Sequence, residues 1–236
     1  MYEVLFRRFV KNHDKTALPE VRFAYGNLSG RVGIAVNFLL SAIKLALGLM
    51  SGAVSVVADA VHNLADAAAS IATLLGFRLA AKPADAEHPF GHGRVEYIAG
   101  FCIAGLILLI GFKLLEASVE KILAPEPPEV SVSMLVILTA SIALQLWLGR
   151  FNKTIGERID SAAIRAAAAD SLNDCIATVV VVASLAFHYA TGIDIDGWAG
   201  VLVALFILHS GWEAARDTLQ PLLGQPPDPA LVEGIE

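Results

Sequence analysis

The amino-acid sequence predicts an all-α, polytopic membrane protein built as a bundle of six transmembrane helices. Of its 236 residues, 56% are hydrophobic and 17% are charged, and the mean hydropathy is +0.64, which is too apolar for an ordinary soluble domain. Apolar runs of about 20 residues recur along the chain, and this is the length that a helix needs to cross the bilayer core. Because lipid offers the backbone no hydrogen-bond partners, these runs are predicted to be helices.

Residues that break helices separate the predicted spans. Gly52 follows the first span, Pro83 and Pro89 follow the second, Pro125 follows the third and Gly192 follows the fifth. The six spans are expected at about 31–50, 54–80, 94–118, 131–150, 165–190 and 197–219. The chain then divides into an N-terminal arm (1–30), a transmembrane domain (31–224), and a linker with the start of a cut-off cytoplasmic domain (225–236).

The distribution of charge predicts the orientation of the bundle. Lys and Arg are abundant in the N-terminal arm and in the second and fourth loops, whereas the first and fifth loops have none and the third has only Lys121. By the positive-inside rule, both termini are expected in the cytoplasm, with the bundle in a bacterial inner membrane. The net charge of −6 lacks the concentrated basic face of a nucleic-acid-binding protein, so no nucleic-acid partner is expected.

Ionisable side chains occur where lipid is expected, on the second and fifth spans. His62 and Asp66 are four residues apart, as are Asp170 and Asp174, so each pair projects from one face of its helix. An ionised Asp at the centre of a span costs about 2.5–3.5 kcal/mol on insertion scales, so these residues are functional candidates. One imidazole and three carboxylates can hold Zn²⁺, Mn²⁺ or Fe²⁺. We predict a four-ligand metal site; the alternative is that these groups only join the helices through polar contacts.

Other polar residues in the spans are expected to support this site or the bundle. Asp59 lies one turn before His62, and we expect it, with Asn63 and Asn173, to lie around the ligands rather than to bind the metal. Lys44 in the first span is expected to pair with an acid in the bundle or to extend toward the membrane surface. Asp196 is expected to be the N-cap of the last helix.

The second loop holds a further group of metal-ligating side chains. Asp85, His88 and His92 offer the ligand types of a zinc site with an open position, and the intervening Pro and Gly indicate a folded loop. A second metal site here is one interpretation. The other is a structural turn in which both histidines bond to the backbone.

Three motifs resemble the cation diffusion facilitator family of metal/proton exchangers. They are Ala58-Asp59-Ala60-Val61-His62-Asn63-Leu64-Ala65-Asp66, His88-Pro89-Phe90-Gly91-His92-Gly93-Arg94-Val95-Glu96, and Asp170-Ser171-Leu172-Asn173-Asp174. The resemblance covers nearly the whole chain and implies a homodimer that alternates between inward- and outward-open states. It implies export of a metal ion in exchange for protons, through a site of His62, Asp66, Asp170 and Asp174. It also implies that Asp85, His88 and His92 hold a second metal.

The fifth span departs from the pattern of the family's zinc transporters, which commonly have His where this chain has Asp170. The Asp-Ser-Leu-Asn-Asp run is more similar to bacterial manganese exporters, so Mn²⁺ is expected slightly ahead of Zn²⁺, with Fe²⁺, Co²⁺ and Cd²⁺ open. We expect a transporter and not an enzyme. The alternatives are an intramembrane metalloenzyme, which would need an open coordination position and a general base, and a membrane metal sensor without transport.

Overall fold

The computed structural model describes residues 2–16, 18–80 and 94–223, and this part of the chain contains seven helices and no strand. The helices are α1 (Glu3–Phe9), α2 (Pro19–Ser51), α3 (Val54–Ala80), α4 (Arg94–Leu123), α5 (Val132–Arg158), α6 (Ala162–Thr191) and α7 (Asp196–Leu223). The predicted all-α membrane fold is confirmed. Five helices, α2 and α4 to α7, are long and apolar enough to cross a membrane. The remaining predicted span corresponds to α3, a 27-residue helix that carries Asp59, His62 and Asp66.

The two predicted glycine ends are correct. Gly52 and Gly192 end α2 and α6 in the left-handed conformation, with φ of 70° and 74°, which Gly adopts without a steric cost. Ser131 and Ser161 cap α5 and α6 by accepting hydrogen bonds from backbone N–H groups three residues on. The start of α2 is different from the prediction. It begins at Pro19, well before residue 31, because Pro at the first helical position favours initiation there.

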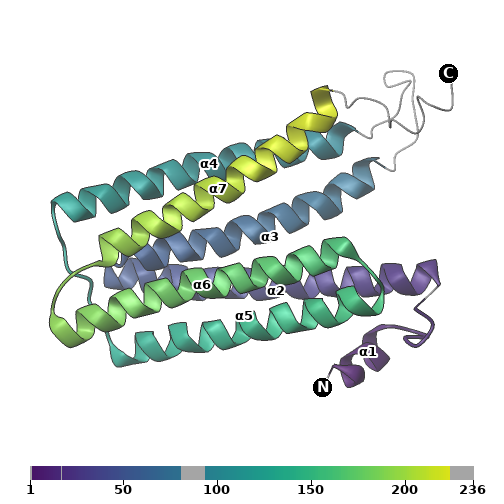
Figure 1. The fold of residues 1–236 in the computed structure, drawn as a ribbon, viewed down its shortest axis with the longest axis horizontal. Coiled ribbons are helices and arrows are strands. Elements are labelled where there is room, and N and C mark those ends of the chain that lie inside the picture. The colour runs from purple at the N-terminus through teal and green to yellow at the C-terminus, as the bar shows by residue number, and fades with distance from the viewer. Residues whose placement is uncertain (1, 17, 81–93, 224–236) are drawn as a thin grey trace.

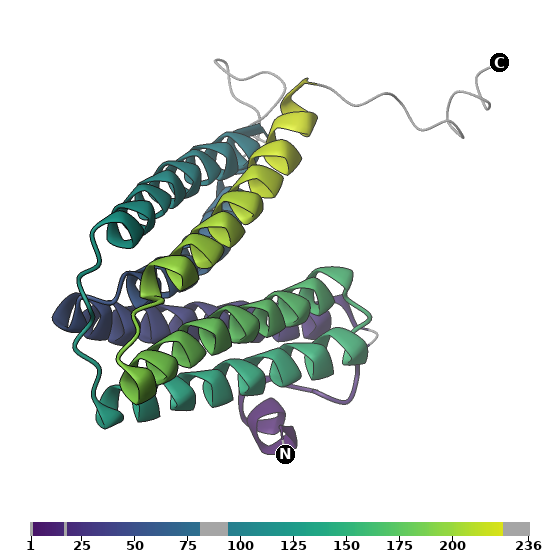
Figure 2. The ribbon, with the colours of Figure 1, turned by 60° about the vertical axis from the view of Figure 1, so that its left-hand side comes forward.

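Five of the six long helices form two groups that diverge from one end of the bundle (Figure 2). Helices α2, α5 and α6 run alongside one another. Helices α4 and α7 pack against each other, and this pair is inclined to the first group (Figures 1 and 2). Helix α3 contacts α2 and α6 in the first group and α4 and α7 in the second. Helices α6 and α7 are joined by a short connection after Thr191 and separate toward Ala162 and Leu223 (Figure 2).

Close packing holds α4 against α7. A Cβ atom placed on Gly200 of α7 would lie 2.5 Å from the Ser118 hydroxyl oxygen of α4, and one on Gly197 would lie 2.8 Å from an Ile122 side-chain carbon. The missing side chains therefore let the two backbones approach each other closely, as is common between membrane helices.

Asp196 does not cap its own helix, so that prediction is wrong. Its buried carboxylate accepts hydrogen bonds from the backbone N–H groups of Val54 and Ser55, at 2.7 and 3.3 Å, and from the Ser55 hydroxyl. Lys121 of α4 donates to the same carboxylate at 2.8 Å and to the Gly52 carbonyl at 2.6 Å. Asp196 therefore caps α3, and its charge is matched by Lys121, which explains why this end of α4 carries a lysine.

The N-terminal helix α1 docks on the opposite end of the bundle. Phe6 is buried against the rings of Tyr25 and Phe151, with centroids 5.3 and 6.1 Å away. The Arg158 guanidinium lies 4.9 Å from the Phe6 ring centroid and pairs with Glu3. The arm before the first span is thus helical and packed against α2 and α5.

Candidate metal-binding site

Three of the predicted ligands converge between α3 and α6. One ligand atom from each of His62, Asp66 and Asp174 lies within 4.8 Å of the other two. The His62 Nε2 atom is 2.9 Å from Asp174 Oδ1 and 3.9 Å from Asp66 Oδ2. His62 and Asp66 meet because they are one turn apart on α3, and α6 brings Asp174 to the same place.

The converging atoms are buried and lack ordinary partners. The exposed fraction of His62 is 1% and that of Asp174 is 2%. None of His62 Nε2, Asp66 Oδ2 and Asp174 Oδ1 makes a well-directed hydrogen bond to any residue that the structure describes. Buried polar atoms are nearly always satisfied, so three such atoms directed at one point fit a site for a cation.

Neighbouring side chains shape this site. The Phe206 ring of α7 lies edge-on to the His62 imidazole, with ring centroids 5.2 Å apart, and restricts its orientation. Buried alanines flank the ligands, with Ala58, Ala60 and Ala67 on α3 and Ala168 and Ala177 on α6. Their small side chains permit the close approach of α3 and α6 that the convergence requires.

Asp170 lies outside this three-residue group. Its side chain is exposed, one turn before Asp174 on α6. Asp66 is partly exposed, with 18% of its side chain accessible, whereas Asp174 is 2% exposed. The site therefore becomes more accessible toward the ends at which the two helix groups separate (Figure 2).

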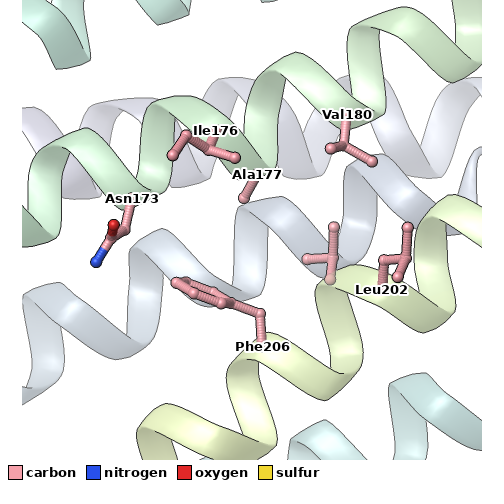
Figure 3. Close-up of a pocket in the computed structure, with 7 residues that line it drawn as sticks. Asn173, Ile176, Ala177, Val180, Leu202 and Phe206 are labelled. Carbon is pink, nitrogen blue, oxygen red and sulfur yellow. The ribbon is translucent and has the colours of Figure 1, made fainter.

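Asn173 lies on a different surface from the ligands. It lines an apolar cavity of about 220 Å³ between α6 and α7, together with Ala177 and Phe206 among others (Figure 3). The Asn173 side chain is exposed at the margin of this cavity, and Phe206 both lines the cavity and packs against His62.

Asp59 and Asn63 belong to a buried polar cluster centred on Lys44. The Lys44 Nζ atom lies 2.8 Å from Asp59 Oδ2, and it donates hydrogen bonds of 2.8 Å to Asn63 Oδ1 and Thr178 Oγ1. The expectation that Lys44 pairs with an acid in the bundle is confirmed. Sequence reasoning missed Thr178 and Gln145, whose side chains hydrogen-bond to each other at 3.1 Å. Their signal was weak, because a single Thr or Gln in a span is common.

The predicted loop ligands Asp85, His88 and His92 lie outside the described residues. The second metal site therefore remains a prediction from the sequence.

Comparison with known proteins identifies the class of membrane protein. Residues 31–223 match the cation efflux transmembrane domain family, and the chain belongs to this family. It is 31% identical over 202 residues to the manganese efflux system protein MneS of Bacillus subtilis (84% of this chain, 68% of the relative). It is 31% identical over 213 residues to the manganese efflux system protein MneP of the same organism (86% and 70%). It is 28% identical over 202 residues to the cation-efflux pump FieF of Cronobacter sakazakii (84% and 67%). The protein is thus a multi-pass membrane protein of a cation-transporting family.

Proposed function

We propose that this protein exports a divalent transition-metal ion from the cytoplasm in exchange for protons, by alternating access. The metal is the substrate, held by His62, Asp66 and Asp174. The observation that supports this most directly is the convergence within 4.8 Å of three buried ligand atoms, none of which makes a well-directed hydrogen bond to a described residue. A divalent cation would satisfy all three at once and offset the charge of the carboxylates.

Asp170 completes the site in this proposal. Its position one turn from Asp174 lets it approach the metal when the two helix groups close around the substrate. The partly exposed Asp66 and exposed Asp170 lie on the side toward the cytoplasm if both termini are cytoplasmic, as the charge distribution favours. The described arrangement then corresponds to access from inside a bacterial inner membrane.

Mn²⁺ is the substrate that we favour slightly over Zn²⁺. Carboxylate oxygens are hard donors that suit Mn²⁺, and Asp170 would add a third carboxylate to the set. The two relatives that are 31% identical are named as manganese efflux proteins. His62 supplies a nitrogen donor that Zn²⁺ also accepts, so the preference is small, and Fe²⁺, Co²⁺ and Cd²⁺ fit the same donors less specifically.

Protons from outside would release the metal by neutralising its ligands. His62 is the natural group for this step, because the ordinary pKa of His, about 6.5, is near cellular pH. A carboxylate must take a second proton if two protons exchange for one ion, and the clustered acids would then titrate as a coupled set. We further propose a homodimer and a second metal at Asp85, His88 and His92, both from the family resemblance.

Two other functions use the same site. An intramembrane metalloenzyme would need an open coordination position for water and a separate general base, whereas all four acidic and imidazole groups, Asp170 included, serve as ligands in this proposal. A membrane sensor would bind metal without moving it. The relatives' names describe efflux, so we propose a transporter that is not an enzyme.

A competition assay in proteoliposomes with an imposed pH gradient tests the proposal. We expect Mn²⁺ to accumulate only when the gradient is present, and excess Zn²⁺ to compete with it. Collapse of the gradient with an ionophore is the control. Metal binding by the purified protein without gradient-driven accumulation would support the sensor and overturn the transporter.

A further inference from the structure

Lys44 makes three close polar contacts inside the bundle. Its side chain is 0% exposed, and Nζ lies 2.8 Å from each of Asp59 Oδ2, Asn63 Oδ1 and Thr178 Oγ1. The ammonium group donates hydrogen bonds to Asn63 and Thr178, and it forms an ion pair with Asp59. Asp59 and Asn63 belong to α3, and Thr178 belongs to α6. One side chain of α2 therefore binds both helices that carry metal ligands.

The partners of Lys44 lie directly beside those ligands. Asn63 follows His62 in the chain, and Thr178 is one turn after Asp174. The Thr178 hydroxyl accepts from Lys44, and its own proton is within reach of the Asp174 carbonyl at 3.0 Å and of Asp59 Oδ1 at 3.2 Å. The cluster therefore adds a polar connection between α3 and α6 beside the 2.9 Å contact of His62 Nε2 with Asp174 Oδ1.

The polar cluster around Lys44 contains a buried pair of opposite charges. Lys44 and Asp59 are both fully buried and cancel each other, so the pair adds no net charge beside the metal ligands. A buried pair of this kind contributes little net stability compared with apolar residues of similar size. Its retention inside the bundle is better explained by what it positions.

We propose that Lys44 is a positioning residue that fixes the separation of His62 and Asp174, and thereby the relative affinity of the site for Zn²⁺ and Mn²⁺. This inference rests on the proposed function. Zn²⁺ requires tetrahedral ligands at about 2.0–2.2 Å. Mn²⁺ accepts a larger set of oxygen ligands, including water. Loosening the connection between α3 and α6 therefore weakens Zn²⁺ binding more than Mn²⁺ binding.

Three variants separate positioning from folding. Lys44→Met removes the connection but leaves the Asp59 charge buried and unpaired, which is strongly destabilising. The double variant Lys44→Met/Asp59→Asn removes both charges and nearly keeps the volume of each side chain, so it is the variant expected to fold. Lys113→Met is the matched control, because Lys113 lies on α4 with its side chain 73% exposed and forms an ion pair with the exposed Glu116.

Calorimetric titration of each purified full-length variant with Zn²⁺ and Mn²⁺ measures the effect. We expect the double variant to bind Zn²⁺ at least tenfold more weakly, in line with the loss caused by removing groups that orient metal ligands. Mn²⁺ affinity falls less, so the ratio of the two dissociation constants changes. A purely structural role would reduce the bound fraction of both metals equally. An unchanged ratio in the double variant overturns the proposal.

A metal-free measurement keeps this inference separate from the proposed function. Spin labels at Ile71→Cys on α3 and Val179→Cys on α6 occupy exposed positions, 41% and 48% accessible, in a background with Cys102 and Cys175 replaced. We expect a narrow distance distribution in the parent and in Lys113→Met, and a broad one in the double variant. Identical distributions would also overturn the proposal. If Asp66→Ala instead binds metal as the parent does, the proposed transport site is wrong, and the label distances alone decide the role of Lys44.

Discussion

Asp196, the first residue of α7, accepts a hydrogen bond of 2.7 Å from the backbone N–H of Val54, the first residue of α3. The two residues are 142 positions apart in the chain. This contact fixes the start of the helix that carries His62 and Asp66 against the pair formed by α4 and α7, and Lys121 balances the charge of the carboxylate.

Replacing Asp196 with Ala is expected to lower the thermal stability of the purified protein. The change removes the cap of α3, worth about 1 kcal/mol, and leaves Lys121 buried without its acid, which costs about 3–5 kcal/mol. The midpoint of thermal unfolding in detergent measures the loss. Asp217→Ala, at an exposed position on the same helix, is the control. Equal midpoints for both variants would show that the cap does not stabilise the bundle.

Replacing Asp66 or Asp174 with Ala is expected to abolish transport while the protein remains folded in the membrane. Each change removes a metal ligand and also a costly buried charge, so stability does not fall in parallel. Metal uptake into proteoliposomes and size-exclusion chromatography measure the two properties. Glu213→Ala, which changes an exposed acid on α7, should transport normally. Parent-level transport by either site variant would contradict the assignment.

Replacing Asp170 with His is expected to move selectivity from Mn²⁺ toward Zn²⁺, because imidazole is a softer donor than carboxylate. The substitution also removes a negative charge, so affinity for both ions falls and only their ratio is informative. Competition binding on the purified protein measures this ratio. If it does not change, Asp170 does not contact the metal, in keeping with its exposed position in the described structure.

Replacing Asp85, His88 or His92 with Ala is expected to weaken transport or assembly without removing metal from the site between α3 and α6. These residues provide a ligand set of their own in the second loop. The bound metal per chain and the oligomeric state are the measurements. Loss of all bound metal in these variants would mean that the main site lies in the loop.

Acidification is expected to weaken the docking of α1 on the bundle. The hydrogen bond from Arg158 lowers the pKa of Glu3, so the stabilisation is present above the ordinary pKa of Glu and is lost as pH falls through the lowered value. Trp147, which stacks on Phe151 with centroids 5.4 Å apart, reports the docking by its fluorescence once Trp198 and Trp212 are replaced by Phe. Glu3→Gln should show no such transition, and an identical acid transition in that variant would exclude Glu3 as its origin.

The sequence predicted which candidate ligands share a face of one helix, but not which ligands of different helices meet. The four-residue spacing places His62 with Asp66 and Asp170 with Asp174 on any helix, and both pairs were predicted on that basis. Which members meet depends on the angle between α3 and α6. The structure brings Asp174 to His62 and leaves Asp170 exposed, because the helices separate toward that end. Likewise, a lysine within a span predicted an acidic partner for Lys44. The hydrogen bond from Lys44 to Thr178 could not be predicted, because it depends on where α6 lies relative to α2.

The sequence by itself determined the all-α membrane class, the order of the long helices, their glycine ends and the candidate metal ligands. These follow from local causes: lipid requires the backbone to satisfy its own hydrogen bonds, and one turn of helix fixes which side chains share a face. Only the tertiary structure decided that Asp196 caps α3 and that Lys44 joins α3 to α6. Those contacts depend on how closely glycine and alanine let separate helices approach and on how the helices are rotated. The spacing of residues within one helix carries no information about either.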